Sequence, residues 1–153
     1  MLRRMGDDKK PMNIIPVDSG LSEWRTMWIG DTLMTDGIKY LEQNQGGKDQ
    51  VLLLVYPQVG ADFTGRVLRA YSESSDTFQF RCSCVVLIRL LLEGDTIIVA
   101  GTQNANGFTA FAKETIAEWM SRQKLDFGKV LQVPLPSFAG KDEALFVFQK
   151  LSV

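Results

Sequence analysis

The sequence contains no histidine, and this absence removes whole classes of chemistry. Without an imidazole there is no Ser-His-Asp or Cys-His catalysis, no histidine general base and little means of holding a transition metal. An enzyme would have to use Asp, Glu, Lys, Tyr or Cys. The carboxylates are scattered, and nothing in their spacing suggests the acid–base pair that proton transfer needs. We therefore expect a protein with no enzymatic activity, no cofactor and no metal.

Net charge, cysteine and long apolar runs are also scarce. The formal net charge is -1, so no global basic field draws the chain onto nucleic acid or an anionic membrane. Only two cysteines occur, and the charged stretch Met1–Lys10 lacks the apolar core of a secretory signal, which favours reduced thiols. Arg89 interrupts the best candidate for a membrane span, Cys84–Leu92. We predict a cytoplasmic protein without a membrane partner.

The two cysteines, Cys82 and Cys84, lie in the most regular part of the chain, where apolar and polar residues alternate. Residues two apart on an extended strand are separated by roughly 6.5 Å, which places these thiols poorly for a mutual disulfide. Two thiols without histidine or further cysteine do not complete a tetrahedral zinc site. They share a face with large apolar residues, so we interpret them as core positions. Those neighbours are Phe78, Phe80, Val86 and Ile88.

Short apolar runs separated by turn residues predict about six strands. The continuous run Asp49–Tyr56 has the length and composition of a strand that is buried on both faces. Pro134 and Pro136 push the strand before them to a sheet edge or a strand end. The other predicted strands are Gly65–Tyr71, the alternating stretch from Thr77, Thr96–Ala100, Lys129–Leu135 and Ala144–Leu151.

The clearest helical pattern spans Gly107–Lys124, where apolar residues recur at three- and four-residue intervals. Asn106 is a plausible cap at its start, and Gly128 marks the end. The region 21–45 allows two short helices. We divide the chain into a flexible arm over residues 1–17 and a single β-rich domain over 18–153. The predicted fold is mainly β, an antiparallel sandwich or barrel.

The order of these segments and their hydrophobic patterns resemble those of the jelly-roll coat proteins of picorna-like viruses. Four stretches carry the resemblance: Gly37–Leu41 after Ile29-Gly30-Asp31, Leu68–Ile88, Leu131–Phe138 and Glu143–Val153. The resemblance implies a structural subunit that self-associates, with a place in a virion. It implies an assembly surface around the proline-marked strand, with Leu135, Pro136 and Phe138 at the contact.

A second stretch, Phe78–Thr102, is similar to the third and fourth strands of OB-fold proteins that bind single strands. There a Gly-Asp turn precedes a strand that a glycine ends, as Gly94, Asp95 and Gly101 do here. This resemblance implies binding of single-stranded nucleic acid by a curved sheet that carries arginines. The residues that we expect to contact the strand are Arg66, Arg69, Arg81 and Arg89.

Overall fold

A computed structural model describes residues 13–20, 31–57, 59, 62–73, 95–104, 107–137 and 142–151. The chain divides into two compact units, Met1–Tyr40 and Leu41–Val153. The predicted alternating strand from Thr77, with Cys82 and Cys84, lies outside the described residues, as do the first of the two short helices predicted within 21–45 and most of the N-terminal arm.

The first unit contains a small parallel ribbon. Strand β1 (Val17–Asp18) pairs with β2 (Leu33–Met34). Helix α1 (Gly37–Gln43) then begins beside Asp36, whose Oδ1 accepts the N–H of Ile38 at 2.8 Å. An aspartate at this position satisfies a backbone donor that has no partner inside the helix. This helix confirms the second of the two short helices predicted in this region.

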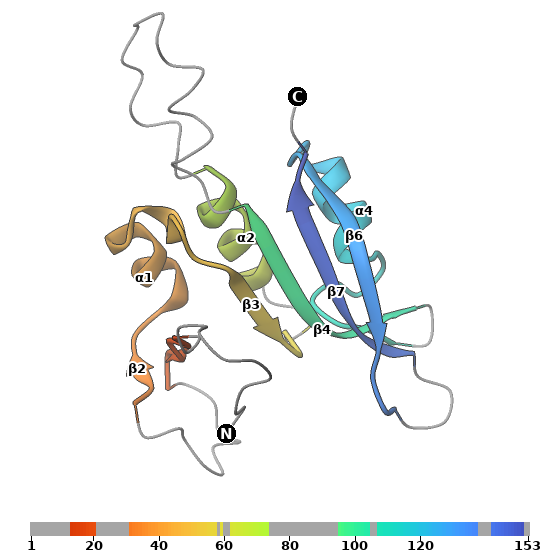
Figure 1. Cartoon of the computed structure of the whole chain (residues 1–153), viewed down its shortest axis with the longest axis horizontal. Coiled ribbons are helices and arrows are strands. Elements are labelled where there is room, and N and C mark those ends of the chain that lie inside the picture. The colour runs from red at the N-terminus through yellow and green to blue at the C-terminus, as the bar shows by residue number, and fades with distance from the viewer. Residues whose placement is uncertain are drawn as a thin grey trace, which may run out of the picture. The chain divides into compact units, whose positions relative to one another are not determined.

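The second unit is built on a mixed sheet (Figure 1), with the strand order β3-β4-β7-β6. The first two strands are parallel, and the remaining neighbours are antiparallel. A short fifth strand pairs with the end of β4. The strands are β3 (Leu52–Val55), β4 (Thr96–Asn104), β5 (Gly107–Phe108), β6 (Phe127–Pro134) and β7 (Glu143–Lys150).

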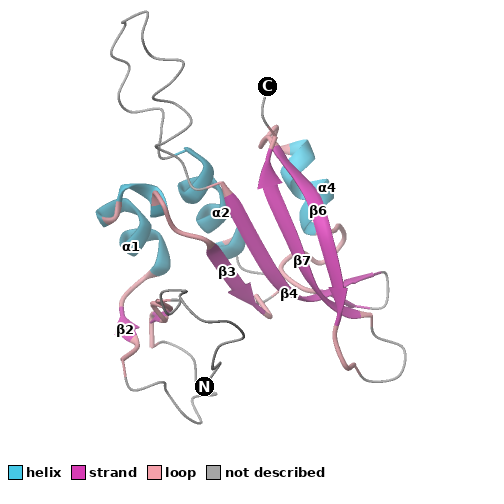
Figure 2. Ribbon diagram, viewed as in Figure 1, coloured by secondary structure: helices cyan, strands magenta, loops and turns pink. Residues whose placement is uncertain are grey.

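Two helices cover one face of this sheet, α2 (Phe63–Glu73) and α4 (Ile116–Arg122), as Figures 1 and 2 show. A short 3-10 turn, η1 (Gln45–Gly47), precedes β3. Helix α4 starts with a capping box: Thr115 Oγ1 accepts the N–H of Glu118, and Glu118 Oε2 accepts the N–H of Thr115. The hydrogen bond from the Thr115 backbone lowers the pKa of Glu118.

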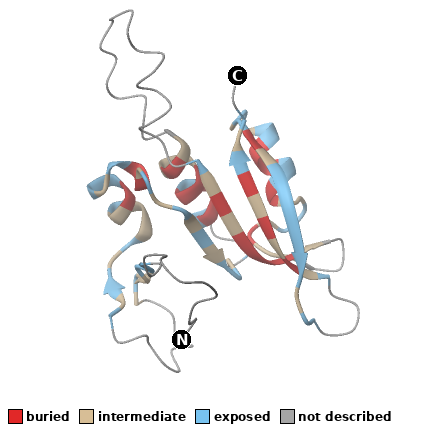
Figure 3. Cartoon of the chain, in the orientation of Figure 1, coloured by how far each residue is buried: buried red, intermediate tan, exposed pale blue. Residues whose placement is uncertain are grey.

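The core lies between these helices and the sheet. The alternate residues of β4 and β7 that face the helices are buried, whereas β6 is almost entirely exposed (Figure 3). Along β4 and β7, alternate side chains therefore point toward the helices, and the side chains between them point to the opposite face of the sheet. The buried apolar residues include Ile97, Val99, Phe146 and Phe148 from the strands, Val67, Leu68 and Tyr71 from α2, and Ile116, Trp119 and Met120 from α4.

The structure has mixed α/β content, and a mainly β fold is not confirmed. Strands β3 and β4 are parallel, so the sheet is not purely antiparallel, and the described residues form no closed barrel. The prediction of a strand over Gly65–Tyr71 was wrong, because these residues lie in α2. In so short a stretch, Val67, Leu68 and Tyr71 also fit the period of a helix, and their burial against the sheet shows that this period prevails.

The predicted helix Gly107–Lys124 is correct only in its second half. Gly107–Phe108 forms β5, and the helix begins at Ile116 with Thr115, not Asn106, as its cap. Backbone and side-chain hydrogen bonds to β4 hold residues 107–109 in an extended hairpin. The spacing of apolar residues along the chain does not reveal such hydrogen bonds.

Four of the predicted strands are confirmed, with shifted ends. Asp49–Tyr56 contains β3, Thr96–Ala100 begins β4, Lys129–Leu135 overlaps β6 and Ala144–Leu151 overlaps β7. The prediction that prolines place the Lys129–Leu135 strand at an edge is also confirmed, because β6 is the last strand in the order. Pro134 ends this strand.

Candidate assembly surface

The sheet face opposite α2 and α4 is apolar, and we call it the open face. Cross-strand pairing forms two rows of side chains that project from it, since paired residues lie on the same side of a sheet. The first row is Leu53, Ile98, Val147 and Leu131, and the second is Val55, Ala100, Leu145 and Val133.

The outer strands of the open face expose large apolar side chains. Leu53 and Val55 of β3 are 49% and 61% exposed, and Leu131 and Val133 of β6 are 52% and 40% exposed. The residues of β4 and β7 between them are half-buried or buried. Contiguous exposed apolar patches on soluble proteins are rarely large, and those that exist mark interaction sites.

The prediction that the strand within Asp49–Tyr56 is buried on both faces was wrong, because Leu53 and Val55 of β3 are exposed. Parallel strands in proteins are normally covered on both faces, and the run Leu52–Val55 is apolar at every position, as such strands are. In the structure only Leu52 and Leu54 lie toward the helices, while Leu53 and Val55 stand in the open face. The strand has the composition of one that is covered on both faces, but among the described residues only one of its faces is covered.

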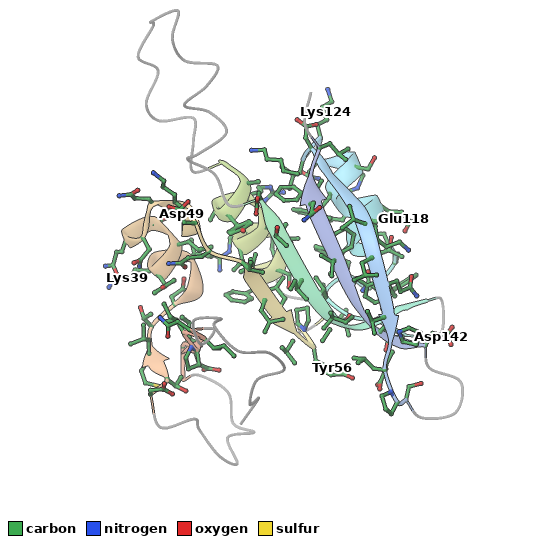
Figure 4. The ribbon with its side chains drawn as sticks, viewed as in Figure 1. Lys39, Asp49, Tyr56, Glu118, Lys124 and Asp142 are labelled. Carbon is green, nitrogen blue, oxygen red and sulfur yellow. The ribbon has the colours of Figure 1, made fainter. Side chains whose placement is uncertain are left out.

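The end of β3 is locally strained. Tyr56 adopts a left-handed backbone with φ 45° and donates its N–H to Ala100 O at 2.9 Å. A bulky residue in this region is uncommon. Figure 4 shows Tyr56 at the tip of the strand. Desolvation, then the charge of Glu143 and a hydrogen bond to its side chain, raise the pKa of Tyr56.

Gln103 lies near the same end of the sheet, and its side-chain amide forms hydrogen bonds within the protein. Its Nε2 lies 2.8 Å from Thr102 O and 3.1 Å from Thr109 Oγ1, and its Oε1 accepts the N–H of Ile116 at 2.7 Å. Gln103 therefore links the β4–β5 hairpin to the first residue of α4. These contacts give Gln103 a structural role.

A cavity of about 170 Å³ lies beside Gln103, with Lys129 and Phe146 in its lining. Lys129 Nζ donates to Gln132 Oε1 at 3.0 Å and lies 5.9 Å from the centre of the Phe146 ring. Pockets that enclose small molecules are usually about 300 Å³ or larger. Among the described residues, no group of three acidic or cysteine side chains is placed to hold a metal ion.

The arginines expected to bind nucleic acid do not form a face on the sheet within the described residues. Arg66 and Arg69 lie on helix α2, and Arg81 and Arg89 lie outside the described residues. Arg69 is engaged, because it lies 5.2 Å from the centre of the Trp119 ring and donates to Gln123 Oε1 at 3.2 Å.

The residues expected at an assembly contact are only partly described. Leu135 is half-buried and donates its N–H to Glu143 O at 2.9 Å, while Pro136 is exposed. Phe138 lies outside the described residues. Leu131 and Val133 lie in the proline-marked strand around which an assembly surface was expected, whereas Leu53 and Val55 of β3 were not anticipated. The signal for Leu131 and Val133 was present in the sequence, since they alternate with Gln132 as in a half-covered strand.

No family model, curated protein or solved structure matches this chain. In the described part of the chain, every helix falls short of the length and apolar character needed to cross a bilayer. The function proposed below therefore rests on the geometry of the open face.

One buried hydroxyl in the first turn of α2 allows a test of the core. Thr64 is fully buried, and its Oγ1 has no hydrogen-bond partner among the described residues. Replacing such a group by an apolar one of the same shape removes a desolvation cost, so Thr64→Val should raise the free energy of unfolding by about 1–2 kcal/mol. Thr109→Val is the matched control, because Thr109 Oγ1 donates a hydrogen bond to Thr102 O at 3.0 Å. Loss of this hydrogen bond should lower the free energy of unfolding. Urea denaturation measures both, and a destabilised Thr64→Val protein would contradict the assignment.

Proposed function

We propose that this protein is a non-enzymatic assembly protein that self-associates by burying the open face of its sheet. The observation that carries the proposal is the exposure of four large apolar side chains from the outer strands β3 and β6. The coat-protein resemblance implies the same class of function, since a coat subunit acts through contacts with its own copies. However, the parallel pair β3–β4 and helix α2 at the start of Leu68–Ile88 differ from a jelly roll, so the proposal rests on the open face.

The size of the open face sets the expected strength of this association. Full burial of a valine or leucine contributes about 1.5–3 kcal/mol, so a half-exposed one contributes about 1 kcal/mol on association. The four outer residues of two copies then supply about 8 kcal/mol. Association costs about 4–15 kcal/mol in lost freedom of motion. We therefore expect weak, concentration-dependent self-association.

A lysine in the open face should abolish association. In Val133→Lys, a charge would have to be buried in the contact, which is costly without a partner. Light scattering of the wild-type chain should give a mass that rises with concentration above 17.1 kDa, whereas Val133→Lys should stay monomeric.

Val59→Lys is the matched control, because Val59 is similarly exposed, at 47%, and lies outside the strands. This variant should associate as the wild-type chain does. A wild-type chain that stays monomeric at millimolar concentration, or a Val133→Lys chain that associates normally, would refute the proposal.

Binding of single-stranded nucleic acid is the alternative that the OB-fold resemblance offers. Arg66 and Arg69 lie on a helix rather than on a curved sheet, and Arg69 already contacts Trp119 and Gln123. No described contact favours this alternative. Anisotropy of a labelled oligonucleotide at low salt tests it, since backbone binding weakens steeply with salt.

A further inference from the structure

Strand β3 is an edge strand whose outer backbone groups have no strand partner among the described residues. Tyr56 donates its N–H to Ala100 of β4. Backbone groups of successive strand residues point to opposite sides, so the groups of Leu52 and Leu54 also face β4. The N–H and C=O of Leu53 and Val55 therefore face away from the sheet. They form a ready-made template for another strand.

The two edges of the sheet differ in how they are protected. Edge strands of natural proteins commonly carry proline, lysine or a bulge, which prevents pairing with other chains. Strand β6 has all three, with Lys129, Pro134 and a register shift between Lys129 and Leu131. Strand β3 has none of them within Leu52–Val55. Pairing with another strand is therefore hindered at β6, whereas at β3 the described residues leave it open.

The geometry points to a second copy of the chain as the partner at the β3 edge. The β3 strands of the two copies pair antiparallel across a two-fold axis. This inference rests on the proposed self-association and specifies one of its contacts. No charged residue occurs from Gln50 to Pro57, so two copies of the strand meet without like charges opposite each other. Identical antiparallel strands close the contact by two-fold symmetry, which is the commonest arrangement of homo-oligomers.

Edge pairing also enlarges the open face. With the two-fold axis perpendicular to the sheet, Leu53 and Val55 of both copies project to the same side. Four strands about 4.8 Å apart and about five residues long cover on the order of 300 Å² of sheet. A stable interface buries about 800 Å² of each partner, so one open face is too small by itself. The joined sheet offers about 600 Å², which comes closer to this requirement than one open face does.

Amide hydrogen exchange of the wild-type chain tests the pairing directly. The Leu53 and Val55 amides should exchange rapidly in dilute protein and become at least tenfold protected as concentration rises. The Tyr56 amide, bonded inside the sheet, is the internal reference and should be protected throughout. Protection of Leu53 and Val55 that does not depend on concentration would mean that the chain covers its own edge, and would overturn the inference.

The variant Leu53→Pro removes one outward N–H and leaves the ladder between β3 and β4 intact. Proline is tolerated where the N–H of an edge strand faces solvent. We expect at least a tenfold weaker dimer by light scattering, with Leu53→Val, which keeps the N–H, close to wild type. Retained protection of the Tyr56 amide verifies that the variant is folded.

Three outcomes separate the edge contact from the face contact. If Val133→Lys still forms a dimer with protected Leu53 and Val55 amides, the edge pairing stands and the proposed association through the open face is refuted. If Leu53→Pro associates as the wild-type chain does and these amides exchange rapidly, the edge pairing is overturned while the proposed function stands. A wild-type chain that is monomeric at every concentration overturns both.

Discussion

Replacing Trp119 by alanine should lower the free energy of unfolding by about 3–5 kcal/mol, the usual cost of truncating a large buried aromatic residue. Trp119 is only 4% exposed and stacks on Phe111, with ring centres 4.9 Å apart and an angle of 9° between the rings. Arg69 of α2 lies 5.2 Å from the centre of the Trp119 ring. The indole therefore joins α2, α4 and the loop before α4, and its loss leaves a cavity among all three.

The contact between the two helices can be tested without truncating the ring. A Cβ added at Gly65 would lie 2.8 Å from Trp119 Cζ2 and 2.6 Å from Asp62 Oδ1, so Gly65→Ala should destabilise by about 1–3 kcal/mol. The exposed carboxylate of Asp62 can move aside, whereas the buried ring of Trp119 cannot. In a Trp119→Ala background the same change should be neutral or stabilising, because alanine favours a helix over glycine by about 1 kcal/mol. Urea denaturation of the wild-type chain, the two single variants and the double variant gives the coupling free energy between Gly65 and Trp119. Equal effects of Gly65→Ala in both backgrounds would contradict this packing.

Removing the hydroxyl of Tyr71 should lower the free energy of unfolding by about 1–3 kcal/mol, because its single hydrogen is shared between two backbone carbonyls that then lose their donor. Tyr71 Oη lies 2.6 Å from Gln50 O and 2.9 Å from Thr96 O. It thus ties the segment before β3 to the first residue of β4. Thermal or urea unfolding of Tyr71→Phe measures the cost. Tyr56→Phe is the control, since Tyr56 is exposed and its change should alter stability by less than about 0.5 kcal/mol.

The same hydroxyl predicts a loss of stability in alkali. Burial, opposed in part by the hydrogen bond with the Thr96 backbone, raises the pKa of Tyr71 above its usual 10.0. A group whose pKa is higher in the folded state stabilises the fold below its unfolded pKa, and this stability is lost as pH rises through the folded pKa. The advantage of wild type over Tyr71→Phe should therefore be constant to about pH 9 and shrink above 10. A constant difference up to pH 11 would argue against a buried neutral hydroxyl.

Several elements of this fold follow from local sequence alone. The apolar run around Leu52–Val55 and the alternation of Glu143–Lys150 identify strands because period two is a property of each strand by itself. Pro134 predicts an edge because proline lacks the donor that a central strand needs. The short helix at Gly37–Gln43 was also found, whereas Gly65–Tyr71 was misassigned because its few residues fit both periods.

Local residue patterns were enough to locate β3, β4, β6 and β7. The packed fold was needed to show that β3 and β4 run parallel, that both helices lie on one face, and that Leu53, Val55, Leu131 and Val133 gather on the other. The physical reason is that burial depends on what packs against each face. Local periodicity states which residues share a face, and only the packing of α2 and α4 determines which face is left uncovered.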